Sequence, residues 1–416
     1  MEIFLLNVVA FLRPIFFIDL DGTNAFDVAA IFTFGLLIAG YLVNTALKKD
    51  AQFSGSDFLI FAFVLWCVAV YVIYIDKSDL RAVARLVIPL LTYVIAKNVI
   101  RRREDYETIL GLIIIGFVVP VLLSVYLIVT GRGIDLVDYW TGITRWQGAY
   151  HGAHTMGHNM AFVLMVMLTY LAFVKLRPSG KNVVAAVALP FQIGLVLLAG
   201  ATLYCLYQSQ VRTAVLGLLI FFSFFMWHVN RRLLVVAAVI GVVGVLSALP
   251  VLMPRFFGDV LLIEQGEFDA DQLGSGRLVI WGHNTKLFFD LPIDRQLAGV
   301  GIGNKSPIEC VYGGCVGGDG ITDSHNDLLD VMIQTGYVGF ALFLAIQIVI
   351  FKRVLMLPDR ERFIFLSWFV AVLVMNLASN SYVTRFGLAQ MYYIVLAYVE
   401  ANIANYPERK EIGGKN

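Results

Sequence analysis

The sequence predicts an all-α integral membrane protein with about twelve transmembrane helices and one large polar loop. The 416-residue chain is 59% hydrophobic and only 15% charged, and its mean hydropathy is +0.79. In a typical soluble domain about a quarter of the residues are charged, so the composition excludes an ordinary soluble protein. The apolar residues gather in runs of roughly 20, the length of a helix that crosses the hydrocarbon core of a bilayer. Basic residues occupy every second connection between these runs, a pattern typical of multi-pass membrane proteins.

Each expected helix is an apolar run bounded by charged or turn-forming residues. The first run is short and contains Arg13 and Pro14. No small-residue cleavage site follows it, so we expect a kinked first span rather than a signal peptide. The expected spans lie at about 3–18, 26–47, 56–75, 79–97, 106–130, 158–175, 183–206, 209–228, 233–253, 327–351, 362–381 and 386–404.

The basic residues predict which side each connection faces, because cytoplasmic loops collect Lys and Arg. Both termini are expected to be cytoplasmic. The alternate connections carry aspartates, and the longest of them is expected to face the periplasm. The expected division is 1–253 for helices one to nine, 254–326 for a periplasmic loop with interfacial helices, 327–404 for the last three helices and 405–416 for a cytoplasmic tail. The basic residues of the expected cytoplasmic connections are Lys48, Lys49, Lys97, Arg101, Arg102, Arg103, Lys175, Arg177, Lys181, Arg231, Arg232, Lys352, Arg353, Arg360 and Arg362.

The net charge and the cysteines narrow the function classes. Acidic and basic residues number 30 and 31, so the formal charge of +1 provides no basic field that binds nucleic acid. Four cysteines without CxxC or Cys/His ligand spacing form neither a zinc array nor a disulfide scaffold. Cys67 and Cys205 lie in apolar runs and are expected to be packing residues. Cys310 and Cys315 share a Gly-rich loop and are expected to form a disulfide if that loop lies in an oxidising compartment.

Arginines at the outer ends of the spans are candidates for function, because charges near a membrane are costly to keep. Arg212 lies between two apolar runs whose connection is too short to form a loop, so its guanidinium is expected near the outer interface. It either marks the end of a span as a snorkelling side chain or binds an anion. Arg277 begins an amphipathic segment that is expected to lie in the interface. The alternative is that Arg277 and Lys286 are only a solvated face of that segment.

Three further arginines are candidates for substrate binding. Arg81 and Arg85 are spaced i and i+4 and share one face near the outer end of the fourth span. Their charges are offset either by Asp76 and Asp79 or by a bound phosphate. Arg145 lies in the polar outer segment that follows the fifth span.

His325 is the candidate general base. Ser324 and Asp327 are spaced as a capping box, which predicts that His325 stands in the first turn of the tenth span. The helix dipole there disfavours the imidazolium, and a neutral imidazole is what a general base requires. On a straight helix Gly336 and Gly339 lie on the same face, roughly 16 to 21 Å below the histidine, where glycines serve close helix packing rather than chemistry. The alternative is that His325 is only a cap or a surface residue.

Two other groups of residues raise the question of a metal ion. His151, His154 and His158 have spacings of three and four, which a helix accommodates, but two glycines among them disfavour a rigid helical site. Asp19 and Asp21 form an Asp-x-Asp pair in the first outer loop. Both patterns are weak, and a metal site is the less favoured interpretation.

The second half of the chain resembles a known family. His325-Asn326, nine residues and then Gly336-Tyr337-Val338-Gly339 match the HN-x9-GxxG pattern of O-antigen ligases, which join O-polysaccharide to the lipid A core. GSGRLVIW and GVGIGN resemble the long periplasmic loop of the wider O-antigen ligase/polymerase superfamily, and Arg212 matches its arginine at the start of a late span. The first half is similar only in topology, and related polymerases share the same C-terminal region.

This resemblance implies a GT-C-like glycosyltransferase of the bacterial inner membrane with a periplasmic active site. The donor would be a glycan on undecaprenyl diphosphate, and the acceptor a sugar hydroxyl of lipid A-core in lipopolysaccharide biosynthesis. Arg212 and Arg277 would bind the diphosphate, Arg81 or Arg85 would assist, and His325 would take the acceptor proton with inversion at the anomeric carbon. No cofactor and no metal ion would be required, because the diphosphate is already a good leaving group. The polyprenyl tail would lie in an apolar groove between spans, among membrane lipids.

The acceptor separates two enzyme hypotheses. A polymerase of O-antigen or exopolysaccharide would use a second lipid-linked repeat unit in place of lipid A-core. A transporter of lipid-linked glycans is the rival from a different class, and it would place its functional charges near the midplane of the bilayer. The candidate charges lie toward one surface and no internal repeat is evident, which favours an enzyme. Asn326, beside the candidate base, is expected to bind substrate.

Overall fold

The structure, a computed structural model, describes residues 2–18, 31, 34–35, 37–42, 54–76, 78–137, 144–175, 189–229, 277–303, 324–379, 383 and 386–401. Within these ranges the chain is mostly helical, as the sequence predicts, with one antiparallel hairpin. The helices are α1 (Glu2–Ile15), α3 (Gly55–Ile73), α4 (Leu80–Val99), α5 (Arg103–Val129), α6 (Ala153–Lys175), α7 (Leu189–Ser209), α8 (Arg212–Val229), α11 (Arg277–Phe289), α12 (Ile293–Ala298), α13 (Asp327–Leu355), α14 (Asp359–Ala378) and α15 (Phe386–Leu396), which continues into a 3-10 turn at Ala397–Val399. The hairpin consists of β1 (Ile134–Val137) and β2 (Thr144–Trp146).

Seven described helices are long and apolar enough to cross a membrane, judged by length and composition: α3, α4, α5, α6, α7, α13 and α14. The apolar stretches of α8 and α15 are shorter. Of the remaining predicted spans, 26–47 is described only in part and 233–253 lies outside the described residues. The chain is therefore a multi-pass membrane protein, and the expected total of about twelve spans stays a prediction.

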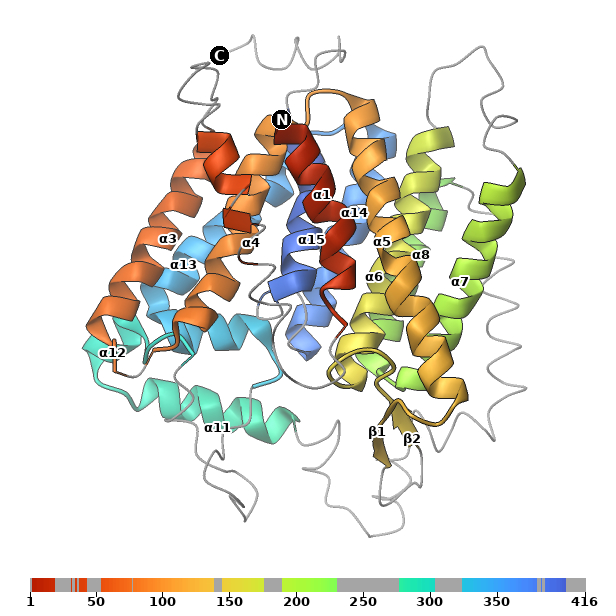
Figure 1. Ribbon diagram of the computed structural model, residues 1–416. Helices are drawn as coiled ribbons and strands as arrows, with labels where there is room; N and C mark the ends of the chain where they lie inside the picture. The colour runs from red at the N-terminus through yellow and green to blue at the C-terminus, as the bar shows by residue number, and fades with distance from the viewer. Residues whose placement is uncertain are drawn as a thin grey trace.

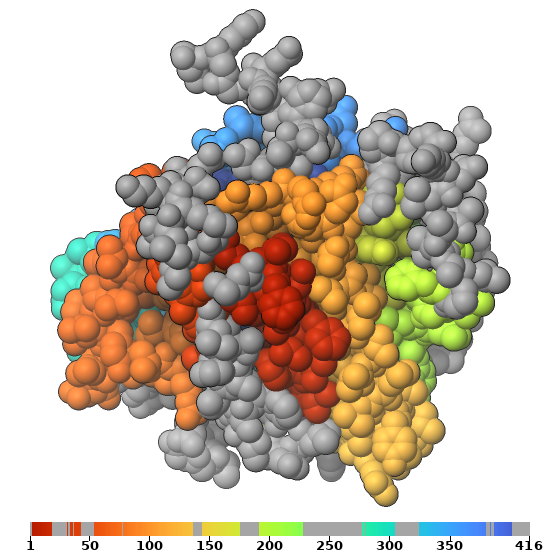
Figure 2. Space-filling view, turned by 45° about the horizontal axis from the view of Figure 1, so that its top comes forward, coloured from red at the N-terminus to blue at the C-terminus, as the bar shows by residue number. Residues whose placement is uncertain are grey.

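The long helices pack as a bundle because most of their surfaces are apolar all round. α1 packs on α5, α4 on α15, α3 on α13 and α8 on α14, while α6 contacts α5, α7 and α8. The closest approach of α1 and α5 is at Gly116, where a Cβ atom would collide with the Phe11 carbonyl oxygen. Figure 2 shows α1 at the surface of the molecule beside α5.

The two ends of the bundle differ in what they carry. The first turn of α1 and the junction of α13 with α14 lie at the upper end in Figure 1, whereas α11, α12 and the hairpin lie at the lower end. The connections that the basic residues predict to be cytoplasmic, 98–105 and 352–361, are thus grouped at the upper end. Described parts of the predicted periplasmic loop, 277–303, lie across the lower end.

A buried ionic network holds the upper end together. Lys97 Nζ lies 2.7 Å from Asp57 Oδ1 and 2.8 Å from Glu400 Oε2, and all three side chains are almost fully buried. Arg353 Nε lies 3.6 Å from Glu400 Oε1. Glu400 Oε2 also accepts hydrogen bonds from Lys97 Nζ at 2.8 Å and from the Ser56 hydroxyl at 2.5 Å. The network joins α3, α4, α13 and the end of α15.

Near its lower end α13 is interrupted at Gly336. This glycine has φ 68° and ψ −176°, a conformation that essentially only glycine adopts. The carbonyl groups released by the interruption bond outside the helix: Val300 N donates to Ile333 O at 3.0 Å, and Trp66 Nε1 donates to Thr335 O at 2.8 Å. The expectation of a straight helix that carries both glycines on the face of His325 is therefore wrong, because α13 has a kink at Gly336.

The glycines of this motif make room for other parts of the chain. A Cβ atom on Gly336 would collide with the backbone of Leu297 in α12 and of Gly299 just after it. A Cβ atom on Gly339 would collide with Thr335 and lie 2.9 Å from Trp66 of α3. The segment 299–303 thus inserts against the interruption, where Gly303 N also donates to Gln334 Oε1 at 3.0 Å.

Gly336→Ala is expected to lower the free energy of unfolding by at least about 2 kcal/mol, because alanine cannot adopt this conformation without strain and the atoms it would meet are backbone. Gly200→Ala in α7 is the control, since nothing lies within 4 Å of the added Cβ atom. Thermal unfolding of both variants in one detergent measures the effect. Equal melting temperatures would contradict this account of the interruption.

Candidate functional site

The candidate residues come together where several helices begin or end at the lower end of the bundle. Arg212 is the first residue of α8, Arg277 is the first residue of α11, and His325 lies two residues before α13. The end of α14 and the start of α6 lie between them, as the contacts below show. All three side chains are half-buried.

Arg212 follows a tight turn between α7 and α8. Gln210 has φ 55°, and the Ser209 hydroxyl donates to Leu206 O at 2.7 Å and accepts from Val211 N at 3.3 Å. The connection is thus as short as the sequence predicts. Arg212 is held at the lower end of the bundle, at the start of a helix. The backbone N–H groups of a first helical turn lack intrahelical partners and also favour anions.

Arg277 is bound to the end of another helix. Its Nη1 donates to the carbonyl oxygen of Ala378, the last residue of α14. Carbonyl groups at a helix C-terminus lack intrahelical partners and carry partial negative charge, so they attract a guanidinium. A guanidinium has five N–H donors, so this bond still leaves it the capacity to bind a substrate anion.

His325 does not stand in the first turn of α13. The cap of this helix is Asn326, whose Oδ1 accepts from Leu328 N and Leu329 N, both at 3.1 Å. The predicted capping box of Ser324 and Asp327 is therefore wrong, because an Asn one position before the helix satisfies the free N–H groups itself. His325 precedes the cap with φ 51°, a left-handed conformation that turns it out of the helix direction.

Contacts on both sides hold the segment that carries His325. The Ser324 hydroxyl donates to the Asp330 carboxylate, and Trp281 Nε1 of α11 donates to Ser324 O at 2.7 Å. Asp327 Oδ2 accepts from Val383 N at 3.2 Å, which ties the start of α13 to the segment before α15. The position of His325 is thus fixed by bonds to its neighbours rather than by the helix.

Two histidines of α6 occupy the centre of this arrangement. The rings of His154 and His325 are stacked, with centroids 6.4 Å apart and planes at 30°. His158, one turn further along α6, is fully buried, and its Nε2 lies 3.3 Å from Ser379 Oγ and 3.4 Å from Thr213 Oγ1. Thr213 is the neighbour of Arg212, and Ser379 is the neighbour of the residue that binds Arg277, so α6 brings the three candidate residues together.

The histidine cluster of the sequence, His151, His154 and His158, is the first candidate for a metal site. Among the residues that the structure describes, no group of three His, Cys, Asp or Glu side chains is placed to hold a metal ion. His151 is exposed, and His154 and His158 make the contacts given above. Asp19 and Asp21 lie outside the described residues, as do Cys310 and Cys315.

The other arginine candidates lie at the same end. Arg81 and Arg85 are exposed in the first turns of α4, and the Asp79 carboxylate caps this helix by accepting from the Arg81 backbone N–H at 2.9 Å. Asp79 N donates to Ile302 O at 2.8 Å, so the segment after α12 also packs here. Arg145 is half-buried in β2, opposite Leu136. Asn326 is occupied as the cap of α13.

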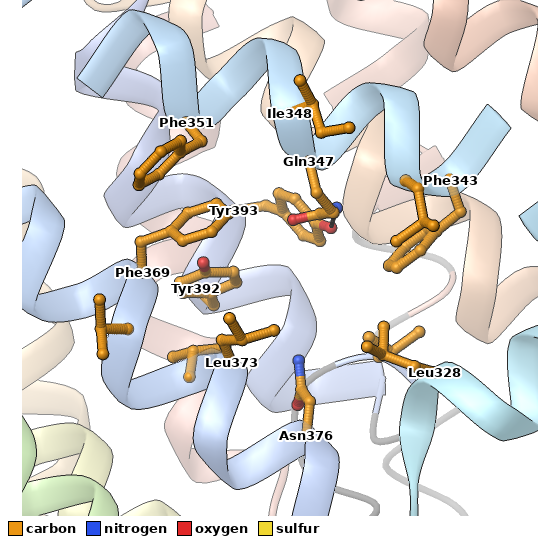
Figure 3. Close-up of a pocket in the computed structure, with 14 residues that line it drawn as sticks. Leu328, Phe343, Gln347, Ile348, Phe351, Phe369, Leu373, Asn376, Tyr392 and Tyr393 are labelled. Atoms are coloured by element: carbon orange, nitrogen blue, oxygen red, sulfur yellow. Dashed lines mark hydrogen bonds between the residues drawn. The ribbon is translucent and has the colours of Figure 1, made fainter. Parts of the chain in front are cut away.

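An apolar groove runs from the site toward the upper end of the bundle, between α13, α14 and α15 (Figure 3). Its volume is about 370 Å³, and Leu328 and Val383 line it near the segment of His325. Ile348 and Leu373 are 52% and 39% exposed, so the groove borders the outer apolar surface. The groove is further lined by Phe343, Leu344, Gln347, Phe351, Phe369, Val370, Val372, Asn376, Tyr392 and Tyr393.

Sequence reasoning missed several of these residues. Trp281, Thr213 and Ser379 carry no motif, and their importance follows only from the partners that folding gives them. The histidines of α6 were visible as a cluster, but the glycines among them concealed that α6 begins as early as Ala153. A signal existed, because residues 154 and 158 are spaced for one helix face.

Comparison with known proteins gives one match. A protein-family model described as "O-Antigen ligase" matches residues 193–344, which contain α8, α11, α12 and the start of α13 and therefore all three candidate residues. No curated protein matches the chain.

Proposed function

We propose, because residues 193–344 match a family model described as "O-Antigen ligase", that this chain transfers an O-polysaccharide from undecaprenyl diphosphate to a sugar hydroxyl of lipid A-core. The observation that carries the proposal is the convergence of Arg212, Arg277 and His325 around α6 at one end of an apolar bundle. Two permanent cations and an imidazole beside an apolar groove match a lipid diphosphate donor and a hydroxyl acceptor in charge and polarity.

In the proposed reaction the acceptor oxygen attacks the anomeric carbon of the donor sugar from the face opposite the diphosphate. A carbon–oxygen bond to the acceptor forms while the bond between that carbon and the diphosphate oxygen breaks, so the configuration inverts. The hydroxyl proton passes to the imidazole of His325, and undecaprenyl diphosphate leaves with the electron pair of the broken bond. Arg212 and Arg277 stabilise the negative charge that the leaving group gains. These side chains supply the whole scheme, which uses neither a cofactor nor a metal ion.

The position of His325 supports its role as the base. Its backbone conformation lifts it out of α13, its ring faces that of His154, and its neighbours are fixed by the bonds of Ser324 and Asn326. A general base must be held within hydrogen-bond reach of the proton it accepts, so a well-fixed but partly exposed imidazole suits the task.

The groove between α13, α14 and α15 is proposed to hold the part of the polyprenyl chain next to the diphosphate. Its lining is almost entirely apolar and rich in aromatic rings, and it passes from the His325 segment along the outer surface of the bundle. A single prenyl chain fits a narrow groove better than the several acyl chains of the lipid A acceptor, which require a broader opening to the bilayer. Two of the polar side chains drawn in Figure 3 bond to each other, with Gln347 Nε2 donating to Tyr393 Oη at 2.8 Å.

Leu373→Trp is expected to weaken binding of the lipid-linked donor at least about tenfold, because the indole would occupy the groove from an exposed position where it costs little stability. Leu377→Trp is the matched control on the same helix, at 41% exposure and outside the groove. Donor affinity is measured for both variants together with that of a short-chain diphosphate sugar. Equal losses in both variants would show that the groove does not hold the chain.

The lower end of the bundle is proposed to face the periplasm, with the protein in the bacterial inner membrane and both termini in the cytoplasm. The grouping of the basic connections at the upper end supports this orientation. Single cysteines at Leu278 and Leu355, 62% and 44% exposed, are expected to react with an impermeant thiol reagent from the periplasm and from the cytoplasm, respectively. Labelling of position 278 only from the cytoplasm would reverse the assignment of the site.

One reconstitution separates ligase from polymerase. Purified protein is incubated with lipid-linked glycan and either lipid A-core or a second lipid-linked repeat unit, and the product that lengthens identifies the acceptor. A ligase lengthens only lipid A-core, and a polymerase lengthens the lipid-linked chain. The same assay with EDTA tests the metal-independent scheme, which predicts no loss of activity. Movement of lipid-linked glycan across vesicles without any transfer would instead support a transporter.

A further inference from the structure

Asn284 is a buried polar residue of α11 for which packing offers no explanation. Its side chain is only 1% exposed, and neither Nδ2 nor Oδ1 has a hydrogen-bond partner among the residues that the structure describes. Ile280 and Phe288, four residues before and after it, are also buried, so these residues form the inward face of α11. A buried amide without partners destabilises the fold relative to a satisfied one.

The rest of this face is ordinary apolar packing. Phe288 contacts Tyr337 edge to face, with ring centroids 5.2 Å apart, and belongs to a small cluster with Val300 and Ile333. A leucine at position 284 would match both the size and the polarity of such a face. The amide therefore weakens the packing of α11 without an internal partner in return, which is typical of a group that serves a ligand.

The position of Asn284 relates it to Arg277. The two residues are seven positions apart, so they lie within about 20° of each other around α11 and roughly 10 Å apart along its axis. Trp281, between them, bonds to Ser324 O beside His325. One side of α11 thus presents a guanidinium, a link to the base segment and an amide in sequence.

We propose that Asn284 binds the sugar that is attached to the diphosphate of the donor. This inference rests on the proposed function, in which Arg277 binds that diphosphate. Seven residues of helix, roughly 10 Å, separate the two positions along the axis, a span that a glycan continuing from the diphosphate covers when it extends along α11. An amide donates and accepts hydrogen bonds at once, which matches neighbouring sugar hydroxyls or an acetamido group and not a second phosphate. Asn284 accordingly recognises the glycan, whereas Arg277 binds the diphosphate.

Asn284→Leu separates the two roles. The variant is expected to bind undecaprenyl diphosphate within about twofold of the wild type, but to bind the lipid-linked glycan about tenfold more weakly, through loss of hydrogen bonds to the sugar. Its melting temperature is expected to stay equal or rise, because an unsatisfied buried amide has been removed. Asn284→Ala provides the same comparison should the leucine disturb packing. Arg277→Ala is expected to weaken both ligands, and Thr285→Val, on the neighbouring face of α11, neither.

The outcomes distinguish this inference from the proposed function. Equal affinity of wild type and Asn284→Leu for the lipid-linked glycan overturns the inference. A lower melting temperature with equal losses for both ligands also overturns it, since Asn284 would then be structural. A wild-type protein that binds neither lipid contradicts the proposed function itself, whereas one that binds both and fails only the Asn284 comparison leaves that function intact.

Discussion

Replacing His325 is expected to slow glycosyl transfer by about 10²- to 10⁴-fold while the protein still binds the lipid-linked donor. The lost group acts on the acceptor hydroxyl, and the donor diphosphate is bound by the arginines. His325→Asn is the cleaner variant, because Asn tolerates the left-handed conformation that this position adopts at φ 51°, whereas Ala adds backbone strain. Single-turnover rates and donor affinities of His325→Asn and His325→Ala are measured in one detergent.

His283→Asn serves as the control for this experiment. It removes a half-buried histidine from α11 at the same end of the molecule. Near-normal turnover in His325→Asn would show that His325 is only a residue of the loop before the cap. Loss of donor binding in parallel with turnover would place it among the phosphate ligands instead.

Arg277→Ala and Arg212→Ala are expected to weaken donor binding and also to reduce turnover. Hydrogen bonds to charged groups contribute about 1.5–3 kcal/mol, so each loss corresponds to a decrease in affinity of about 10- to 100-fold. Lysine is expected to restore binding only in part, because a point charge cannot reproduce the bidentate contact of a guanidinium. Arg277→Lys also changes the bond to Ala378 O at the end of α14.

Arg295→Ala, an exposed arginine of α12, is the control for net charge at this end of the bundle. Donor affinities for the four variants and the control are compared at two salt concentrations, because screening weakens a diffuse field far more than a desolvated contact. Donor binding that is unchanged in both alanine variants would mean that these arginines are snorkelling or structural side chains.

The sequence by itself determined the features that depend on near neighbours along the chain. The length of an apolar run decides whether a helix can cross a bilayer, so the long helices that the structure describes lie where apolar runs predict them, with ends shifted by a few residues. A short connection decides that Arg212 begins a helix, and amphipathic spacing decides that residues 277–289 form one. The candidate base and arginines were also visible, because a charged or titratable residue beside an apolar run has few structural reasons to be there.

Two local predictions failed because a competing residue or a distant segment decided the outcome. Ser324 and Asp327 have the spacing of a capping box. Asn326, which directly precedes the helix, caps it instead, because its side-chain oxygen accepts from the free backbone N–H groups of the first turn. Gly336 was expected inside a straight helix. The segment after α12 and Trp66 of α3 take over the carbonyl groups there, and this stabilises an interruption that α13 alone would not adopt.

Only the tertiary structure decided which residues meet. The ring contact of His154 with His325 joins positions far apart in the chain. His158 lies between the start of α8 and the end of α14, where it contacts Thr213 and Ser379. The groove beside the site and the buried amide of Asn284 likewise exist only once helices pack. The physical reason is that hydropathy and helix capping are set by residues within a turn or two, whereas contacts and burial depend on which helix faces which, and in an apolar bundle almost every face is equally suited to packing.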